Sequence, residues 1–493
     1  MNNTTNNNGI KSNNHFEKTL KEWITEEKCA VEFINVISKL WFDKSIELII
    51  FRRQLLERSP SNILNKHSYA ENIINKKLNI KDSLLLAKAI LDTNIAPARI
   101  DIGRLNKEWT EEKDNYKDVN SFINDKLKAF INVSPRSKEY KDVILYGFGR
   151  IGRLVARELI NIAGDGSRLR LRAIVTRNTD AANIKKRISL FRKDSVHGPF
   201  NGIAIDDADN KSLYINGHIV KMLSVKNPED MNYEEEGITN ALLIDNTGIF
   251  RDRISLSRHL KAKGVDKVLL TAPAKGDIPN IVYGVNQDDF DLNKEKIFSA
   301  ASCTTNAIVP ALSIIEKKIG IETGHIETIH SYTNDQNLLD NIHKKPRRGR
   351  SAALNMVLTS TGAGDAAVKI IPILKGKLTA NAIRVPTPDV SLAILSLNLK
   401  KETSREEITE LLRNASLKGN LIEQIRFSTS QEAVSSDFIG DSCAGIFDSP
   451  STIVSNNKKN IIIYIWYDNE FGYTNQVIRL AKHISMVKSY RYY

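Results

Sequence analysis

One cysteine of this chain has neighbours that suit nucleophilic chemistry. Cys303 lies in the segment SAASCTTNAIVPAL, between small hydroxylated residues and an apolar run that predicts a buried helix. At a helix N-terminus the dipole favours the thiolate and lowers the pKa of the thiol. His330 ends the predicted strand IETIH and is the candidate base. We predict a nucleophile and its partner, although taken alone each residue also fits a packing role.

A glycine-rich turn lies farther upstream, in the segment VILYGFGRIGRLVARELI. Gly147, Gly149 and Gly152 have the spacing G-x-G-x-x-G, between an apolar strand and a helix. The first glycine permits a tight turn, the second lets a pyrophosphate approach the backbone, and the third lets the helix pack closely on the strand. Arg150 and Ile151 begin the helix, whose unpaired N–H groups suit phosphate. The turn therefore predicts a dinucleotide site.

The end of the next predicted strand bears on which dinucleotide binds. Sites that prefer NAD usually place an acidic residue there, on the adenosine ribose. Here the segment AIVTRNTD places Arg177 at that position, with Asp180 shortly after it. An arginine suits the 2′-phosphate of NADP, whereas a solvated Arg177 would leave the ribose to Asp180 or to the backbone. NAD and NADP both remain open.

The elements that must position these residues change in character near residue 140. Apolar residues at helical spacing predict helices between residues 15 and 132, whereas residues 1–14 are rich in asparagine and are expected to be disordered. Residues 133–141 are interpreted as a linker. From Val143 onward, strands and helices alternate, which predicts a parallel sheet with ligands at the carboxyl ends of its strands.

The bulk composition excludes several classes of protein. Three cysteines cannot form a disulfide framework, and the N-terminus lacks the apolar core of a secretion signal. No apolar stretch reaches the roughly 20 residues needed to cross a bilayer. We therefore expect a soluble cytoplasmic protein without a membrane partner. The net charge of +13 fits a basic solvated surface, and it would also suit anionic ligands or nucleic acid.

Several further segments follow in a fixed order, namely GFGRIGR, DSVHG, ASCTTN, HSYT, TSTGAG, RVPTPDVS and WYDNEFGY. Together they resemble phosphorylating glyceraldehyde-3-phosphate dehydrogenases over about residues 141–487. The resemblance implies an α/β Rossmann domain and an α+β catalytic domain with a mixed or antiparallel sheet, and the helical spacing adds an N-terminal all-helical extension that lies outside the resemblance. The predicted organisation is a tail at 1–14, the extension at 15–140, the NAD(P) domain at 141–302, the catalytic domain at 303–469, and a helix at 470–487 that returns to the NAD(P) domain.

The resemblance also implies a reaction. Cys303 would attack the aldehyde of glyceraldehyde 3-phosphate, and His330 would take the thiol proton. Hydride would pass to NAD or NADP, leaving a thioester that inorganic phosphate resolves to 1,3-bisphosphoglycerate. Such an enzyme would act in glycolysis or gluconeogenesis, as a homotetramer on small-molecule substrates. The resemblance implies no metal.

The site residues of the family map onto particular positions of this chain. The substrate phosphate would contact Thr333 and Arg384. The attacking phosphate would meet neutral donors, which suit a group that also leaves as product; they are Ser302, Thr304, Thr361 and Gly362. Besides the glycine turn and Arg177, the cofactor would contact Lys226, Thr271, Asn469 at the carboxamide and Tyr473 near the nicotinamide ring.

One departure from the family pattern concerns the substrate phosphate. Asp335 lies where many relatives have a threonine, and a carboxylate there is unfavourable unless it pairs with Arg347, Arg348 or Arg350.

Two other functions remain as alternatives. One is erythrose-4-phosphate dehydrogenase, in which water resolves the thioester. The other is a regulatory or RNA-binding protein on the same scaffold, for which the basic charge is the motive.

Overall fold

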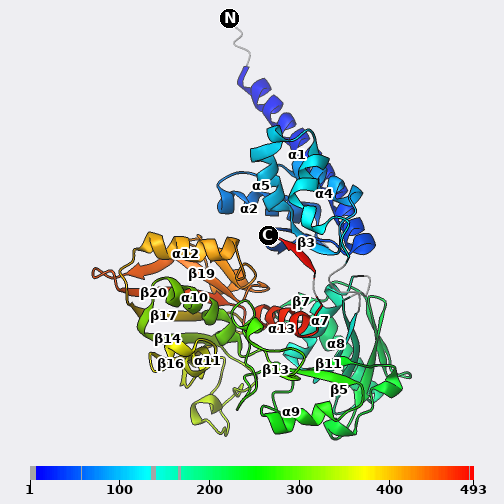
Figure 1. The fold of residues 1–493 in the computed structure, drawn as a ribbon, viewed down its shortest axis with the longest axis vertical. Coiled ribbons are helices and arrows are strands. Elements are labelled where there is room, and N and C mark those ends of the chain that lie inside the picture. Colours follow the sequence, from blue (N-terminus) through cyan, green and yellow to red (C-terminus); the bar gives the residue numbers. More distant parts are fainter. Residues whose placement is uncertain (1–6, 57, 135–139, 165–167, 488) are drawn as a thin grey trace, which may run out of the picture. The chain divides into compact units, whose positions relative to one another are not determined.

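The computed structural model describes residues 7–56, 58–134, 140–164, 168–487 and 489–493. The chain divides into two compact units (Figure 1). The N-terminal unit contains residues 1–138 together with residues 488–493, and the second unit contains residues 139–487. The last residues of the chain therefore belong to the same unit as the first.

The N-terminal unit packs helices against a small sheet. Its strands lie in the order β2-β1-β3-β21, and both β1 and β21 run parallel to β3. Phe33 and Leu40 of the long first helix are fully buried in its apolar core. The elements are α1 (Asn7–Lys44), β1 (Glu47–Ile50), β2 (Arg53–Gln54), α2 (Pro60–Tyr69), α3 (Glu71–Ile74), α4 (Ile80–Asp92), β3 (Ala98–Asp101), α5 (Ile102–Glu112), α6 (Val119–Lys126) and β21 (Tyr490–Tyr492).

Two expectations for this unit are wrong in part. The extension is mostly helical but not all-helical, because four short strands form its sheet. A four-residue apolar run such as ELII is too short for its period to distinguish a strand from a helix. The tail is not disordered throughout, since α1 begins at Asn7. Helix formation is cooperative and extends from the amphipathic stretch that follows. Residues 1–6 and most of the predicted linker, residues 135–139, lie outside the described residues.

The second unit begins with an eight-stranded sheet in the order β13-β12-β11-β4-β5-β10-β9-β8. The pairs from β13 to β10 are parallel, and those from β10 to β8 are antiparallel. The strands are β4 (Lys141–Tyr146), β5 (Leu169–Thr176), β8 (Ala204–Asp207), β9 (Ser212–Ile215), β10 (His218–Ser224), β11 (Ala241–Asp245), β12 (Val265–Leu270) and β13 (Ile297–Ser299). The strand order reverses between β4 and β11, which is the switch point where a Rossmann sheet binds its ligand.

Helices cover both faces of this sheet. One face packs against α7 (Arg150–Asn161), α8 (Ala181–Arg192) and α13 (Phe471–Ile484), and the other packs against α9 (Arg253–Leu260). A two-stranded ribbon of β6 (Lys193–Asp194) and β7 (Gly198–Pro199) follows α8. The predicted Rossmann fold is confirmed, with a helix from the C-terminal part of the chain, α13, packed on its first helix.

A mixed seven-stranded sheet forms the rest of the second unit, in the order β15-β16-β14-β17-β20-β19-β18. Helices α10 (Cys303–Lys318), α11 (Ala363–Ile370) and α12 (Arg405–Leu417) pack against it in one apolar core. Its strands are β14 (Ile321–Ser331), β15 (Val357–Thr359), β16 (Leu378–Val385), β17 (Ser391–Leu399), β18 (Ile425–Ser428), β19 (Gly445–Val454) and β20 (Asn460–Tyr467). This α+β arrangement is also as predicted, whereas the boundary expected at residues 302/303 stays a prediction.

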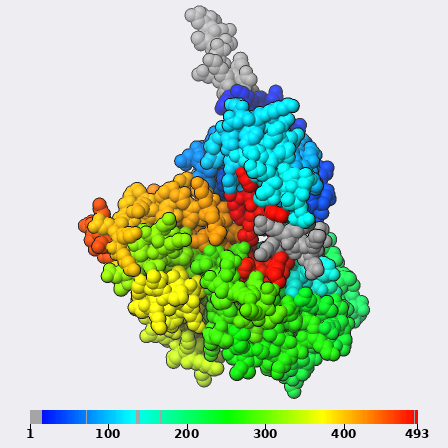
Figure 2. All heavy atoms as spheres, viewed as in Figure 1, coloured from blue at the N-terminus to red at the C-terminus, as the bar shows by residue number. Residues whose placement is uncertain are grey.

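The surface in Figure 2 shows red atoms of the chain's C-terminus lying against cyan atoms of the N-terminal unit. These are the residues of β21, which pair with β3 through Tyr490 and Ala98.

In the described part of the chain, none of the helices is both long enough and apolar enough to cross a bilayer.

Candidate active site

Cys303 is the first residue of α10. Strand β13 ends at Ser299, and the chain then turns at Ala301, which has a positive φ of 54°. Ser302 caps the helix, because its Oγ accepts a hydrogen bond from the backbone N–H of Thr305 at 3.0 Å. The residues that follow are buried in the apolar core and anchor the helix. The thiol therefore lies at a fixed helix N-terminus.

His330 lies beside this thiol. The Sγ of Cys303 is 3.6 Å from Nε2 of His330, which is buried near the end of β14. The parallel pairing of β14 with β16 places Arg384 directly opposite His330. Nδ1 of His330 lies 2.8 Å from the carbonyl oxygen of Ser331, and Nη1 of Arg384 donates to the same oxygen at 2.7 Å. The strand register thus brings thiol, imidazole and guanidinium together.

Burial controls the protonation of this pair. Although part of Cys303 is exposed, burial of the thiol raises its pKa, and the positive charge of Arg384 offsets this only in part. Burial and Arg384 lower the pKa of His330 to about 3. Our expectation of a thiol with a lowered pKa is therefore wrong for the chain without ligands. The pair is a neutral thiol and a neutral imidazole, and Nε2 can accept the thiol proton.

Most of the predicted phosphate ligands lie at two helix N-termini. Thr304 follows the nucleophile, with its Oγ1 4.0 Å from Sγ and 3.0 Å from Oη of Tyr467. Thr361 and Gly362 precede α11, and Oγ1 of Thr361 accepts a hydrogen bond from the backbone N–H of Ala363. A Cβ added to Gly362 would meet no atom within 4 Å, so this helix end is open to a ligand.

Asp335, the departure from the family pattern, lies close in sequence to Thr333, a predicted ligand of the substrate phosphate. Thr333 is partly buried just after β14, and exposed Asp335 follows it. Arg348 forms an ion pair with Asp335, and Nη2 of Arg348 also donates to Oγ1 of Thr359 at 3.0 Å. The expectation that an arginine of the basic segment pairs with Asp335 is confirmed. The carboxylate is thereby compensated by a guanidinium.

The glycine turn has the shape that a dinucleotide needs. Gly147 has a φ of 96°, and a Cβ on Gly152 would lie 2.5 Å from the carbonyl oxygen of Gly147. In contrast, a Cβ on Gly149 would meet no atom within 4 Å, which leaves the space that a pyrophosphate would fill. Arg150 begins α7, and Ile151 packs against the core. These residues fit NAD(P).

The adenosine side of the sheet carries two exposed cations. Thr176 of β5 pairs with Ser224 of β10, and Arg177 directly follows the first strand. Lys226 lies two residues beyond the second strand, and both cationic side chains are exposed. Two neighbouring cations at adjacent strand ends suit the 2′-phosphate of NADP, whereas a NAD site would leave both solvated. The arrangement is compatible with either cofactor.

The three remaining cofactor candidates are held by hydrogen bonds. Oδ1 of Asn469 accepts from Oγ of Ser331 at 2.9 Å, which leaves the amide nitrogen on the opposite side of the group. Oη of buried Tyr473 donates to the carbonyl oxygen of Ala301 at 3.0 Å, close to the nucleophile in sequence. Oγ1 of Thr271 donates to the backbone carbonyl of Asp245 at 3.1 Å.

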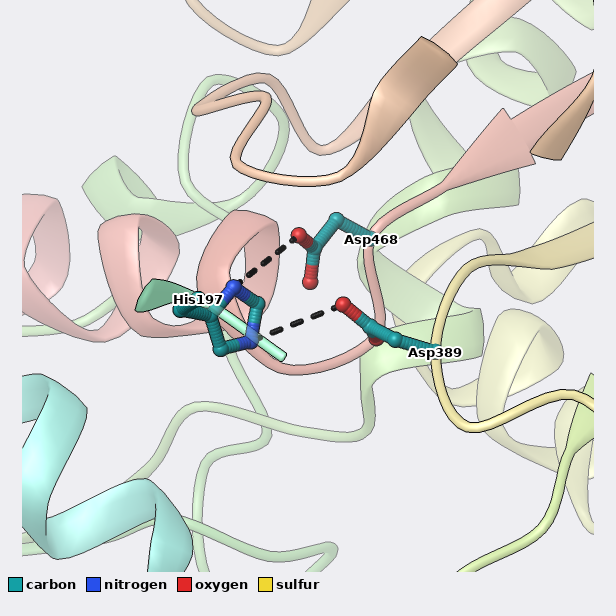
Figure 3. A group of neighbouring side chains, drawn as sticks. All are labelled: His197, Asp389 and Asp468. Atoms are coloured by element: carbon teal, nitrogen blue, oxygen red, sulfur yellow. Dashed lines mark ion pairs between the residues drawn. The ribbon is translucent and has the colours of Figure 1, made fainter. Parts of the chain in front are cut away.

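The structure adds residues to which sequence reasoning gave no role. Ser331 and Ser391 both donate to Asn469, and Glu470 pairs with Arg150. Each lies within a segment that the resemblance already contained, so the signal was present but the partner was distant in sequence. Among the described residues, His197, Asp389 and Asp468 also form a group with ligand atoms within 4.8 Å of one another (Figure 3).

Comparisons with known proteins agree with this geometry. The family model for the glyceraldehyde 3-phosphate dehydrogenase NAD binding domain matches residues 141–253, and the model for the C-terminal domain matches residues 302–469. A glyceraldehyde-3-phosphate dehydrogenase-like protein of Pseudomonas aeruginosa is 47% identical over 457 residues, which is 92% of this chain and 98% of the relative. The glyceraldehyde-3-phosphate dehydrogenase of Zymomonas mobilis is 39% identical over 70% of this chain and 98% of its own length.

A Rossmann sheet joined to a mixed sheet, with a cysteine and a histidine in contact, defines a dehydrogenase that uses NAD or NADP. The chain belongs to the glyceraldehyde-3-phosphate dehydrogenase family. The alignment with the Pseudomonas protein is longer than the second unit, so it extends into the N-terminal unit. That unit is an addition to the two domains of the family models.

Proposed function

We propose that this enzyme oxidises and phosphorylates glyceraldehyde 3-phosphate to 1,3-bisphosphoglycerate, reversibly, through a thioester on Cys303. The observation that carries the proposal is the distance of 3.6 Å between Sγ of Cys303 and Nε2 of His330, with Arg384 paired beside them. The names of the relatives support the substrate. The set of neutral donors for an attacking phosphate favours phosphorolysis over hydrolysis, and so favours this reaction over erythrose-4-phosphate dehydrogenase.

In the first step, Sγ of Cys303 attacks the aldehyde carbon while Nε2 of His330 takes the thiol proton. Nδ1 lies 2.8 Å both from the Ser331 carbonyl oxygen and from Nη1 of Arg384, and the tautomer with its hydrogen on Nδ1 is the one that leaves Nε2 free to accept. The backbone N–H of Cys303, at the helix N-terminus, is a suitable donor for the developing oxyanion. The imidazolium returns its proton to this oxyanion, which gives a hemithioacetal hydroxyl. His330 takes that proton again as hydride leaves the carbon, and a thioester results.

In the second step, inorganic phosphate attacks the thioester carbon, the C–S bond breaks and 1,3-bisphosphoglycerate leaves. Thr361 and Gly362, at the open N-terminus of α11, would bind this phosphate together with Ser302 and Thr304. Arg384 and Thr333 would hold the phosphate of the substrate, where a permanent charge gives tight binding. Product release is easier from neutral donors than from a guanidinium.

NAD or NADP, when bound, supplies the hydride acceptor. The open space at Gly149 suits its pyrophosphate, and the amide nitrogen of Asn469 suits its carboxamide oxygen. Arg177 and Lys226 would face the adenosine ribose. A steady-state comparison of NAD with NADP, using glyceraldehyde 3-phosphate and phosphate, decides between the cofactors.

The test of the reaction is an assay of two aldehydes with and without inorganic phosphate. We expect oxidation of glyceraldehyde 3-phosphate to require phosphate, with kcat/KM about tenfold or more above that for erythrose 4-phosphate. A phosphate-independent preference for the four-carbon sugar would overturn the proposal. The Cys303→Ser variant should bind NAD but form no product, which separates cofactor binding from chemistry.

We also propose that the enzyme is a cytoplasmic homotetramer acting in glycolysis or gluconeogenesis. Its three cysteines all lie within the described residues and none forms a disulfide, as is usual in a reducing compartment. The loop between β14 and β15 exposes several large apolar side chains, an arrangement typical of a subunit interface: Leu338, Leu339, Ile342, Leu354 and Met356. Light scattering after size exclusion measures the assembly, and a monomer would contradict this part of the proposal.

A further inference from the structure

A buried group of charged side chains includes both sequence neighbours of Asn469. Nε2 of His197 lies 3.5 Å from Oδ2 of Asp389 and 3.2 Å from Oε2 of Glu470. Nδ1 of His197 lies 3.9 Å from Oδ2 of Asp468, on the other side of the ring (Figure 3). One imidazole therefore contacts three carboxylates, which come from the loop before β17 and from the turn between β20 and α13.

Asp468 organises the turn that carries Asn469. Its Oδ1 accepts hydrogen bonds from the backbone N–H of Glu470 at 2.9 Å and from that of Phe471 at 2.6 Å. Its Oδ2 accepts from the N–H of Gly440 at 2.8 Å. Three donors on one side chain require an acceptor at each oxygen, which a carboxylate provides and a carboxamide does not.

The glycine turn is tied to the same group. Glu470 accepts two hydrogen bonds from the guanidinium of Arg150, at the start of α7. Asp194 lies 3.4 Å from Nη2 of Arg150, and its Oδ1 also accepts from the backbone N–H of Val196 and His197. Asp194, at the end of β6, thus fixes the backbone that carries the imidazole of His197.

Asp389 differs from the other carboxylates of the group because it accepts no hydrogen bond from the described residues. The side chain is fully buried, and neither carboxylate oxygen has a hydrogen-bond partner among the described residues. Burial and the charge of Asp468 raise the pKa of Asp389 to about 8. Burial raises the pKa of Asp468 as well, although the charge of His197 and three backbone N–H donors favour its anionic form. Ser391, two residues along the chain, donates from Oγ to Oδ1 of Asn469 at 2.8 Å.

The surroundings of His197 favour its charged form, whereas those of Asp389 favour the neutral form. Burial opposes its protonation, but the hydrogen bond with Glu470 and the charge of Asp468 prevail and raise the pKa of His197. The group therefore contains an imidazolium and the guanidinium of Arg150 among four carboxyl groups. A proton on Asp389 reduces the excess of buried negative charge.

We propose that His197 and Asp468 are positioning residues for the nicotinamide end of the cofactor. Asp468 holds the turn that presents Asn469 through three backbone hydrogen bonds, and His197 contacts both Asp468 and Glu470 of that turn. The inference rests on the proposed role of Asn469 at the carboxamide.

The experiment applies one substitution to both aspartates. Asp389→Asn should leave the Kd for NAD within about twofold, because neither oxygen of Asp389 accepts a hydrogen bond that an amide would lose. Asp468→Asn should weaken NAD binding about tenfold, because its amide nitrogen would face a backbone N–H. His197→Gln should have a similar effect, since it removes the cation. His218→Gln, at a half-buried histidine of β10, is the matched control and should change nothing.

The readout is calorimetric titration of the full chain with NAD and with ADP-ribose, which lacks the nicotinamide. Weakening should be at least about threefold larger for NAD than for ADP-ribose, since Asn469 contacts only the missing group. Equal weakening for both ligands would show a general structural defect and overturn the inference. A harmful Asp389→Asn would overturn it too, and this arm holds even if the other variants fold poorly.

Two further results separate this inference from the proposed function. If the wild-type chain neither binds NAD nor oxidises glyceraldehyde 3-phosphate, the proposed function fails, and the positioning role fails with it. If the wild type does both but the variants match it, the positioning role alone fails. One equivalent of a divalent metal in the purified protein would also overturn the inference, because a metal ion would then supply the positive charge.

Discussion

At the scale of residues, burial and hydrogen bonding determine what the side chains can do. Cys303 lies at a helix N-terminus and His330 touches it, yet burial keeps both groups neutral in the chain without ligands. The neutral imidazole can therefore accept a proton, and it does not form an ion pair with a thiolate. The nucleophile is formed during the attack on the aldehyde.

The pH dependence of alkylation tests this assignment. The rate at which iodoacetamide modifies Cys303 should rise with pH through about 9 and beyond, because burial raises the pKa of the thiol above its ordinary value of 9.0. Peptide mass spectrometry after timed alkylation measures the rate, and the Cys303→Ser variant gives the background. A rate that is already constant at neutral pH would show a preformed thiolate and contradict the prediction.

The two exposed cations at the adenosine side give a second prediction. The double variant Arg177→Asp with Lys226→Asp should raise the KM for NADP about tenfold or more, since carboxylates would repel the 2′-phosphate. The KM for NAD should change little. Lys185→Asp with Lys186→Asp, at two exposed residues of α8, makes the same change in net charge and is the control.

Parallel losses with NAD and NADP in the double variant would show that these cations do not face the ribose. A similar loss in the control variant would show a long-range charge effect instead.

Residues whose roles depend on local structure could be predicted from the sequence. Cys303 follows a small-residue turn and begins an apolar helix, and Gly147 follows a strand, so both patterns lie within one short segment. The pKa of Cys303 was not predictable, because it depends on how much chain covers the thiol. The contacts of His197 were also missed, since its partners lie in segments distant in sequence.

At the scale of elements, the strand–turn–helix unit around the glycines carries a paired prediction. Gly152→Ala should destabilise the unit by about 2 kcal/mol or more, because its Cβ would collide with the Gly147 carbonyl oxygen at 2.5 Å. Gly149→Ala should fold normally but bind NAD weakly, since its Cβ enters the space left for phosphate. Thermal unfolding and NAD titration of both variants measure the two effects.

If Gly149→Ala binds NAD as the wild type does, the pyrophosphate does not approach that backbone. If Gly152→Ala keeps wild-type stability, α7 is able to move away from the turn.

A buried histidine gives the N-terminal unit its own pH dependence. Nδ1 of His67 lies 2.9 Å from the carbonyl oxygen of Ile63, and Nε2 lies 2.9 Å from Oγ of Ser83. Burial lowers the pKa of His67 below 6.5, so the unfolded chain binds the proton more readily. The stability that neutral His67 contributes is therefore present above about pH 6.5 and is lost as the pH falls below that value.

Denaturant unfolding at several pH values measures this effect by tryptophan fluorescence. Three of the four tryptophans, Trp23, Trp41 and Trp109, lie in the N-terminal unit, and Trp466 lies in the other. The His67→Gln variant should be less dependent on pH below neutrality. An unchanged pH dependence in that variant would assign the effect to other groups.

Among the elements, those with long periodic patterns were predicted and the short strands were not. The helical spacing from Leu20 to Trp41 lies within α1, and the alternation after Val143 matches the Rossmann sheet. Strand β1 has four residues, and β21 has three, so neither shows a period. Their strand character comes from pairing with β3, which local sequence does not reveal.

At the scale of the whole molecule, the two units differ in where their chain segments come from. The second unit is continuous, whereas the N-terminal unit includes β21 from the far end of the chain. Tyr490 packs near Phe130 with ring centroids 5.2 Å apart, and Oη of Tyr492 donates to Glu108. Tyr490 and Tyr492 are thus partly buried and pack against the core of the N-terminal unit.

Removing residues 489–493 should therefore destabilise the N-terminal unit by about 2–3 kcal/mol, through lost aromatic burial and strand pairing. The affinity for NAD and the activity should stay close to those of the wild type. Unfolding followed by tryptophan fluorescence measures the first effect, and Tyr493→Ala, which keeps the strand residues, is the milder control.

A single unfolding transition, unchanged by the deletion, would contradict this view of β21. Loss of NAD binding in the truncated protein would show that the terminal residues also support the second unit.

The position of β21 has a consequence for synthesis of the protein. A ribosome makes most of the N-terminal unit first, but residues 490–492 are made only after the whole second unit. The N-terminal unit is therefore made with one edge of β3 unpaired. That edge can pair with β21 only after the second unit has been synthesised. A truncated translation product would keep that edge exposed, and such an edge is a site for aggregation.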